Sequence, residues 1–242
     1  PALAINSSMS TFAKSASKLP AAAPGKNSEW TRTLNSHYQQ NLERSPSPGN
    51  VQMADIIAWL NRRLPDDAIL TNGAGNYAVW LQRFYQFRQY RTQLGPTNGS
   101  MGYGVPAAVA AKLTCPERVV VSFSGDGCFL MNGQEIATAA QYGANVIFVV
   151  INNGMYGTIR MHQERNYPGR VSGTDLHNPD FVALAQAYGL HGELVTVTAG
   201  FEPAFERCLA MSRPCLIEVR VDPEALTPRL SLSQIRAQSS KQ

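Results

Sequence analysis

The chain has 242 residues, 44% of them hydrophobic, and a formal net charge of +4 at pH 7. This length accommodates one large α/β domain with an appendage, and the scattered lysines and arginines form no basic stripe that would indicate a nucleic-acid-binding protein. No apolar run approaches membrane-spanning length, and the four cysteines lack metal-type spacing, so we expect no membrane partner and a cytoplasmic location.

The first 50 residues differ in composition from the rest and precede the main domain. Residues 9–19 predict a short amphipathic helix, and residues 20–26, rich in proline and small residues, predict a linker. A second helix is predicted over 30–43, with an apolar stripe that we expect to dock on the main domain. From this composition and these predicted elements, we interpret residues 1–50 as the end of a preceding domain plus a linker.

The main domain is predicted over residues 51–228. Its apolar runs alternate between strand-like and helix-like periods, which predicts an α/β fold with a doubly wound, mostly parallel sheet and helices on both faces. The predicted strands are 68–71, 119–123, 146–151, 193–197 and 214–221, and the predicted helices are 51–64, 77–85, 107–113, 132–141, 180–188 and 201–211. Residues 229–242 are predicted to form a polar C-terminal tail.

The stretch from Val119 to Asn153 carries the chemistry. A buried strand breaks at Gly125-Asp126-Gly127, a helix is predicted with Asn132 as its N-cap and Glu135 as its capping-box partner, and a second strand ends on Asn152-Asn153. In such a β-α-β unit the carboxyl ends of both strands meet at one edge of the sheet, where α/β proteins bind ligands.

Asp126 and Asn153 are therefore predicted to face one crevice. A carboxylate oxygen, an amide oxygen and a nearby backbone carbonyl suit Mg²⁺, which takes few protein ligands and completes its shell with water and phosphate oxygens. The turn amides of Gly127 and Cys128 are candidates to bind those phosphates. From the residues alone, we interpret this edge as a metal-bridged diphosphate site.

The sequence GDG is followed after 24 residues by NN. This spacing resembles the signature of thiamine-diphosphate enzymes. The sequence from about Thr71 to Pro179 resembles the diphosphate-binding domain of the acetolactate synthase-like group. The resemblance implies the thiamine-diphosphate-binding fold, preceded by a remnant of a middle domain. It also implies that Asp126 and Asn153 bind Mg²⁺ through their side chains and Met155 through its carbonyl. The implied cofactor-binding residues are Gly75, Asn76, Tyr77, Gly99, Met101, Gly125, Asp126, Gly127, Cys128, Asn153, Met155 and Tyr156.

The resemblance also implies roles near the reacting atoms. Met101 would wedge under the bent cofactor while the Gly99 carbonyl accepts from its 4′-amino group, although a methionine alone is more often core. Ile159 and His162 would lie nearest the substrate, and His162 stands where acetolactate synthases that make branched-chain precursors usually have tryptophan. A proton-shuttling role for His162 competes with a plain surface position. Arg160 and Glu164, four residues apart, predict a surface pair worth about 0.2–0.5 kcal/mol.

The implied activity is decarboxylation of a 2-oxo acid followed by carboligation of the enamine. The activating glutamate would come from a pyrimidine-binding domain of the same or a neighbouring subunit, in a homodimer or homotetramer, so this chain alone is expected to be inactive. The sequence leaves open which 2-oxo acid is used and whether FAD binds in other domains. The alternatives are a non-ligating decarboxylase of the benzoylformate or indolepyruvate type, or a non-catalytic diphosphate-binding module.

Overall fold

The structure is a computed structural model that describes residues 2–21, 23, 25 and 28–240. It contains two compact units, Pro1–Glu43 and Arg44–Gln242. The first unit holds helices α1 (Met9–Ala16) and α2 (Ser28–Asn41), neither of which has a buried residue. The Ser8 side chain accepts from Thr11 N and so begins α1. The predicted linker falls partly outside the described residues, and the docking of the second helix stays a prediction.

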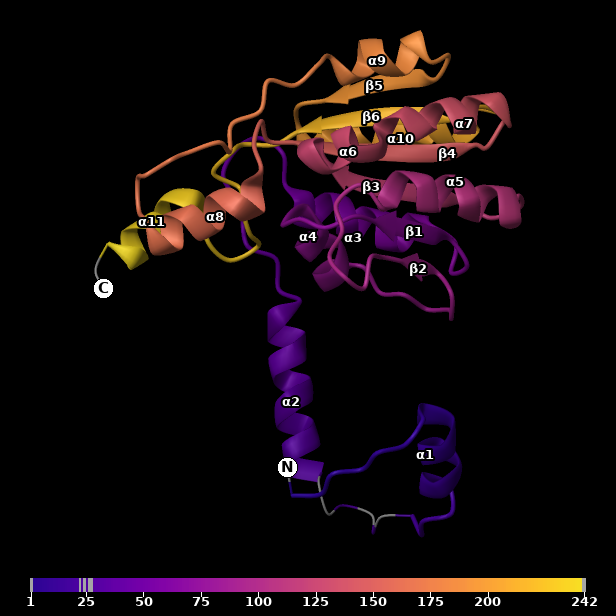
Figure 1. The fold of residues 1–242 in the computed structure, drawn as a ribbon, viewed down its shortest axis with the longest axis vertical. Helices are drawn as coiled ribbons and strands as arrows, with labels where there is room; N and C mark the ends of the chain where they lie inside the picture. The colour runs from indigo at the N-terminus through magenta and orange to yellow at the C-terminus, as the bar shows by residue number, and fades with distance from the viewer. Residues whose placement is uncertain (1, 22, 24, 26–27, 241–242) are drawn as a thin grey trace. The chain divides into compact units, whose positions relative to one another are not determined.

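A six-stranded sheet forms the centre of the second unit, and every pair of neighbouring strands is parallel. The strand order is β2-β1-β3-β4-β6-β5 (Figure 1). The strands are β1 (Ile69–Asn72), β2 (Gln93–Leu94), β3 (Val120–Gly125), β4 (Val146–Asn152), β5 (His191–Val195) and β6 (Cys215–Arg220). The predicted doubly wound sheet is confirmed, and β2 is an unpredicted two-residue edge strand.

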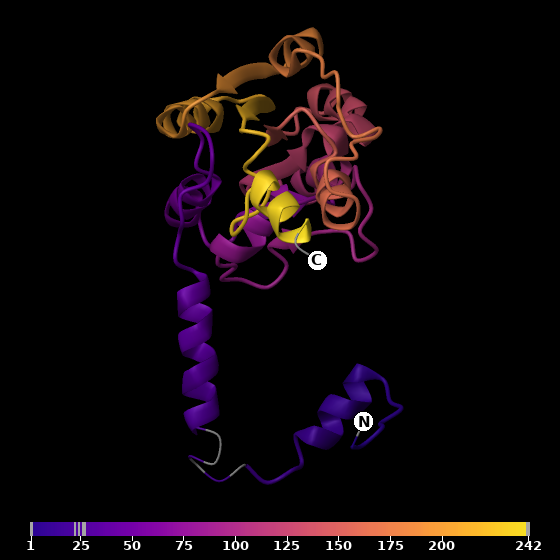
Figure 2. The same ribbon diagram turned by 90° about the vertical axis from the view of Figure 1, so that its left-hand side faces the viewer.

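Helices cover both faces of this sheet, as the two ribbon views show (Figures 1 and 2). One face carries α3 (Met53–Arg63), α4 (Tyr77–Phe84) and α10 (Phe201–Ala210). The other carries α5 (Gly104–Thr114), α6 (Asp126–Asn132), α7 (Ile136–Gln141) and α9 (Phe181–Ala187). Two apolar cores result, one on each side of the strands.

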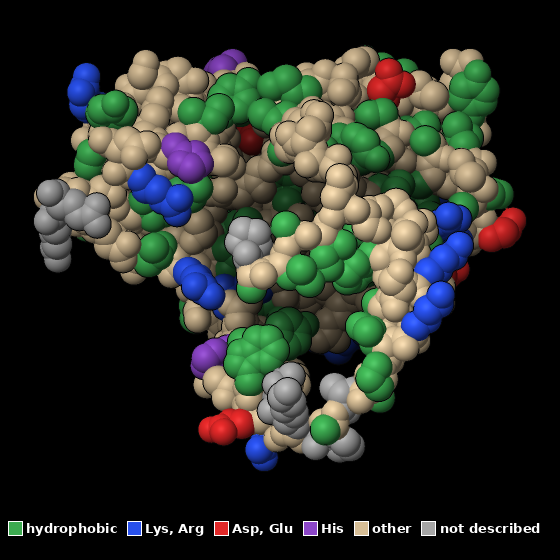
Figure 3. Space-filling view, turned by 60° about the horizontal axis from the view of Figure 1, so that its bottom comes forward, with side chains coloured by type: hydrophobic (Ala, Val, Ile, Leu, Met, Phe, Trp, Pro, Cys, Tyr) green, Lys and Arg blue, Asp and Glu red, His purple; other side chains and the backbone are tan. Residues whose placement is uncertain are grey.

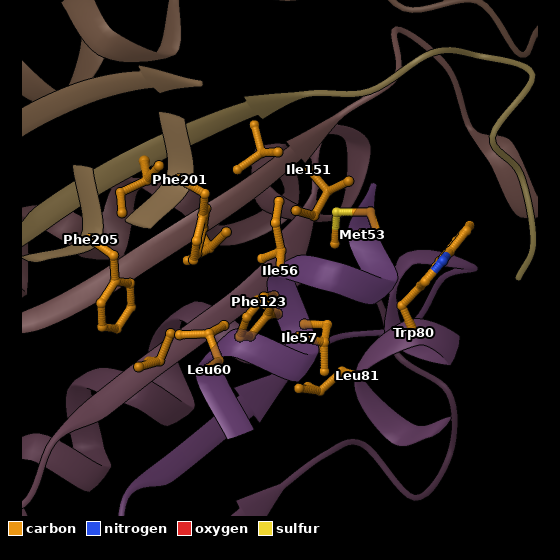
Figure 4. Close-up of a cluster of buried hydrophobic side chains, with 14 of the residues drawn as sticks. Met53, Ile56, Ile57, Leu60, Trp80, Leu81, Phe123, Ile151, Phe201 and Phe205 are labelled. Carbon is orange, nitrogen blue, oxygen red and sulfur yellow. The ribbon is translucent and has the colours of Figure 1, made fainter. Parts of the chain in front are cut away.

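The larger core lies under α3. Ile56, Ile57 and Leu60 are at most 2% exposed and lie close to Phe123 of β3 and Leu81 of α4 (Figure 4). Fully burying each such side chain stabilises the fold by about 1.5–3 kcal/mol. This packing fixes β3, whose carboxyl end carries the GDG turn.

The predicted helix over 132–141 differs from the observed structure. Helix α6 begins at Asp126, directly after β3, and a short 3₁₀ turn at Gly133–Glu135 separates it from α7. The predicted capping box was wrong: Asn132 is the last residue of α6, and its Nδ2 donates to the Gly102 carbonyl at 3.2 Å.

Two helices lie beyond the carboxyl edge of the sheet and pack on each other (Figure 1). They are α8 (Gly157–Asn166) and α11 (Leu232–Ser239), so the predicted polar tail over 229–242 contains a helix. Ser231 and Gln234 form a capping box at its start. Leu232 and Ile235 pack with Met161 of α8 in a third apolar cluster.

The predicted surface pair on α8 is buried. The Glu164 side chain is 1% exposed, and its carboxylate accepts from Arg160 of α8 and from Arg236 of α11. The Gly169 N–H donates to the same carboxylate at 2.8 Å. Glu164 therefore joins α8 to α11 and does not lie on a solvent-exposed face of its helix.

The surface of the second unit retains several large hydrophobic side chains, among them Tyr103, Leu130 and Met131. On the face in Figure 3, hydrophobic side chains lie in small groups separated by polar and backbone atoms. None of the described helices is both long and apolar enough to cross a membrane.

Candidate functional site

The GDG turn and the Asn-Asn pair meet at the carboxyl edge of the sheet. Strands β3 and β4 are parallel neighbours, with Gly125 in register with Ile151. Asp126 directly follows the last residue of β3, and β4 ends at Asn152. The parallel pairing of β3 and β4 therefore brings both motifs to one edge of the sheet, as their spacing predicted.

Asp126 is 2% exposed and is held by hydrogen bonds on both carboxylate oxygens. Its Oδ1 accepts from Gly127 N at 2.9 Å, and its Oδ2 accepts from Gly154 N and from Asn178 Nδ2, both at 2.8 Å. Burial raises the pKa of Asp126 above its ordinary value, although these hydrogen bonds act in the opposite direction. The Gly127 N–H, predicted to bind phosphate, thus has a partner within the chain.

Sequence reasoning missed a second layer behind Asp126. Asn178 lies just before α9, and its Nδ2 also donates to Asn152 Oδ1 at 2.9 Å. Asn152 Nδ2 in turn donates to Glu218 Oε1 of β6 at 2.9 Å. No local pattern marks Asn178 beyond the helix-start signal of Asn178-Pro179, and Glu218 lies between apolar residues of β6, two residues before Arg220.

One pocket brings most of the predicted residues together. Its lining includes Gly75, Asn76, Tyr77, Met101, Gly125, Asp126, Gly127, Cys128, Asn153, Met155 and Tyr156. Trp80 of α4 and Leu226 after β6 add apolar walls, and Thr158 and Ile159 of α8 complete the rim. Asp126 is the only carboxylate among the described residues that line it.

Two predicted residues lie outside this pocket. His162 is exposed on α8 and does not line it. Gly99 is exposed and lines a neighbouring open depression with Asn72 and Gly95, although Gly75 borders both. Of the two side chains predicted nearest the substrate, only Ile159 reaches the pocket, where it is 50% exposed.

Tyrosine rings explain why the GDG turn needs glycine. A Cβ on Gly125 would lie 2.9 Å from the Tyr77 ring, and a Cβ on Gly127 would lie 2.5 Å from the Tyr156 ring. A side chain at either place would overlap an aromatic ring. The backbone of the turn thus approaches side chains of this chain closely, as glycine permits.

The glycine-rich turn after β1 is tied to α8 and to the GDG turn. Asn76 N donates to Thr158 Oγ1, and Thr158 Oγ1 donates to Asn76 Oδ1, both at 3.0 Å. Tyr77 donates its phenol hydrogen to Cys128 Sγ at 3.3 Å, and Gly102 N donates to the same sulfur at 3.1 Å. Burial raises the pKa of Tyr77 well above its usual range. Cys128 therefore connects three segments around the pocket.

Comparison with known proteins decides the family. Residues 73–219 match the family model described as thiamine pyrophosphate enzyme, C-terminal TPP binding domain. The chain belongs to the thiamine pyrophosphate enzymes. The matched range contains the GDG turn, the Asn-Asn pair and the two strands that carry them, so the predicted resemblance is confirmed.

The relatives of this thiamine pyrophosphate enzyme domain include acetolactate synthases. The large subunit from Corynebacterium glutamicum is 37% identical over 177 residues, which cover 70% of this chain and 28% of that protein. The isozyme 2 large subunit from Escherichia coli K12 is 32% identical over 197 residues, or 80% of this chain and 36% of that protein. The chain thus spans about a third of the length of these relatives.

A solved structure shares the fold. It is the thiamine diphosphate-dependent 4-hydroxybenzoylformate decarboxylase of Rhodococcus jostii RHA1, with a TM-score of 0.69 and 34% identity. The likeness covers 74% of this chain and 34% of that one. Acetolactate synthases and a thiamine diphosphate-dependent decarboxylase are therefore both similar to this domain.

The donor chemistry of the pocket fits a thiamine diphosphate site with Mg²⁺. Asp126 and Asn153 carry carboxylate and amide oxygens, and both line the pocket together with Met155. The described residues contain no group of three or more His, Cys, Asp or Glu side chains that could hold a metal ion. An ion that takes few protein ligands and relies on water and phosphate oxygens, as Mg²⁺ does, suits this set.

Proposed function

We propose that this domain binds the diphosphate of thiamine diphosphate through a Mg²⁺ ion, in an enzyme that decarboxylates a 2-oxo acid and joins the remainder to a second carbonyl compound. The observation that carries the proposal is the pocket in which the buried Asp126 lies with Asn153 and Met155 at the carboxyl edge of β3 and β4. The likeness to acetolactate synthases supports the carboligation step.

The chain's own residues have defined tasks in this proposal. Asp126 and Asn153 bind the metal through side-chain oxygens, and Met155 binds it through its carbonyl. Met101 and Trp80 offer apolar surface for the rings of the cofactor. When bound, thiamine diphosphate supplies the positively charged ring that takes up the electrons left as carbon dioxide departs. The apolar walls exclude water from that charge, which strengthens electrostatic interactions in the pocket.

The proposal also requires a carboxylate from outside this pocket. Asp126 is assigned to the metal and is the only carboxylate among the described lining residues. As the resemblance to the acetolactate synthase-like group implies, we propose that a pyrimidine-binding domain, of the same or a neighbouring subunit, supplies an activating glutamate in a homodimer or homotetramer. The 242-residue chain by itself should then show no turnover with any 2-oxo acid, and measurable activity without a partner would contradict this.

A non-ligating 2-oxo acid decarboxylase is the second candidate, because the solved structure of similar fold is a decarboxylase. Product analysis with pyruvate in the full-length protein separates the two. Acetolactate as the main product supports carboligation, whereas acetaldehyde alone supports simple decarboxylation. A protein that binds the cofactor but releases no carbon dioxide from several 2-oxo acids would be a non-catalytic module. Binding of FAD by other domains stays a prediction.

A further inference from the structure

A buried carboxylate on β6 is joined to Asp126 of the candidate metal site by three successive hydrogen bonds, which pass through Asn152 and Asn178. Glu218 has no exposed surface, and its Oε1 accepts from Asn152 Nδ2 at 2.9 Å and from Arg220 Nε at 2.7 Å. Its Oε2 has no hydrogen-bond partner among the described residues. Burying a carboxylate with one oxygen unpaired is costly, so the position of Glu218 in β6 calls for a physical reason.

The reason lies in the direction of the hydrogen bonds. An ionised carboxylate can only accept, whereas a side-chain amide donates from one end and accepts at the other. Glu218 therefore requires Asn152 to turn Nδ2 toward it. Asn152 Oδ1 must then face the opposite way, where it accepts from Gly154 N at 3.0 Å and from Asn178 Nδ2 at 2.9 Å.

The same logic extends to Asp126. Because Asn152 presents an oxygen, Asn178 must present Nδ2, and that nitrogen also donates to Asp126 Oδ2 at 2.8 Å. A reversed Asn178 amide would place its oxygen against the carboxylate of Asp126. Carboxylate, amide, amide and carboxylate thus form one hydrogen-bonded chain with an acceptor at each end. Glu218 orients Asn152 from one end, and Gly154 N and the Asp126 carboxylate favour the same amide orientations from the other.

We propose that Glu218 is a positioning residue that acts through Asn152 and Asn178 to fix the orientation of the Asp126 carboxylate for a divalent cation. This inference rests on the proposed function of the pocket, since it assigns the metal to Asp126. Groups that orient metal ligands from behind commonly change metal affinity about 10- to 100-fold when they are replaced. Glu218 lies too far along the chain of hydrogen bonds to contact the ion itself.

The test is a titration of Mn²⁺, as a spectroscopic substitute for Mg²⁺, into the full-length protein with saturating thiamine diphosphate, with free Mn²⁺ followed by electron paramagnetic resonance. Glu218→Gln keeps the size of the side chain but can donate as well as accept, so it no longer dictates how Asn152 faces. We expect its Mn²⁺ affinity to fall about 10- to 100-fold. Affinity within twofold of wild type would overturn the inference.

A matched control tests whether any lost carboxylate near β6 has this effect. Glu193 lies on the neighbouring strand β5 and accepts from Arg207 and His191, with no bond to the Asn152 chain. Glu193→Gln makes the same chemical change, and we expect Mn²⁺ affinity to stay within twofold of wild type. An equal loss in both variants would mean that Glu218 acts through general stability.

A double-mutant cycle tests the route. If Glu218 acts through Asn152, then Asn152→Ala should weaken Mn²⁺ binding, and adding Glu218→Gln should cause no further loss. Additive losses would overturn the proposed route. If Glu218→Gln fails to fold, Asn178→Ala removes the hydrogen bond to Asp126 at a half-buried loop position. Unchanged Mn²⁺ affinity in that variant would overturn the inference.

Failure of the proposed function is distinguishable from failure of this inference. Wild-type protein that binds no Mn²⁺ with thiamine diphosphate would overturn the proposed function and, with it, the role of Glu218. Wild-type protein that binds Mn²⁺, with Glu218→Gln binding it equally well, would overturn only the role of Glu218.

Discussion

Removal of the Glu164 carboxylate should destabilise the second unit strongly. The carboxylate is 1% exposed and accepts from Arg160 Nη2 at 2.7 Å, from Arg236 Nε and Nη2 at 2.8 and 2.7 Å, and from Gly169 N at 2.8 Å. Glu164→Ala leaves the Arg160 guanidinium, on a residue 8% exposed, without this partner. Breaking a buried ion pair by removing one partner costs about 3–5 kcal/mol.

The assay is urea unfolding at pH 7, monitored by far-ultraviolet circular dichroism. Free energies of unfolding are compared with one common slope of free energy against urea concentration. We expect Glu164→Ala to lower the free energy of unfolding by about 3–5 kcal/mol. Arg165→Ala, an exposed position on the same helix, serves as the control and should change it by less than about 0.5 kcal/mol. A loss below about 1 kcal/mol for Glu164→Ala would refute our account of how α8 is held to α11.

Three further predictions follow from single contacts. Gly127→Ala should cost about 1–3 kcal/mol of stability because the new Cβ meets the Tyr156 ring, and a thermodynamic cycle with Tyr156→Ala should recover part of that loss; strict additivity would contradict the contact. Asp180→Ala should cost about 1 kcal/mol in urea unfolding, because Asp180 accepts from Ala183 N at the start of α9, and an unchanged midpoint would contradict this cap. Arg236 holds the pKa of Glu164 at about 2, below its ordinary 4.5, so its stabilising effect is full above pH 4.5 and is lost as the pH falls toward 2. Urea midpoints of wild type should therefore drop over that range more steeply than those of Glu164→Gln, and parallel curves would contradict the assignment.

The sheet could be predicted because its strands carry strong local signals. The run from Val146 to Ile151 is apolar and rich in β-branched residues, and it lies wholly buried in β4 as expected. The meeting of Asp126 with Asn153 was predictable for the same reason, since two parallel strands joined by one crossover leave little topological choice.

Elements whose signals depend on distant packing were missed. Helix α11 has only Leu232 and Ile235 as buried residues, too few for a clear apolar stripe. Its capping box, Ser231 with Gln234, was the local signal that could have revealed it. The opposite error occurred at Asn132, where the spacing to Glu135 imitated a capping box although the helix had begun at Asp126.

The second layer of the site could not be predicted from spacing. Asn178 and Glu218 are far apart in the chain. Asn178 reaches Asp126 from the loop before α9, and Glu218 reaches Asn152 because β6 pairs with β4. The burial of Glu164 likewise depends on Arg236, 72 residues away. An i, i+4 spacing reports a neighbour on one helix and carries no information about a second helix that covers it.

The central claim is that Asp126 holds a metal ion required for binding thiamine diphosphate. Its most direct test is calorimetric titration of thiamine diphosphate into the full-length protein, with and without Mg²⁺, for wild type and Asp126→Ala. We predict binding that requires Mg²⁺ in the wild type and no binding in the variant. Metal-independent binding, or equal binding by Asp126→Ala, would contradict the claim.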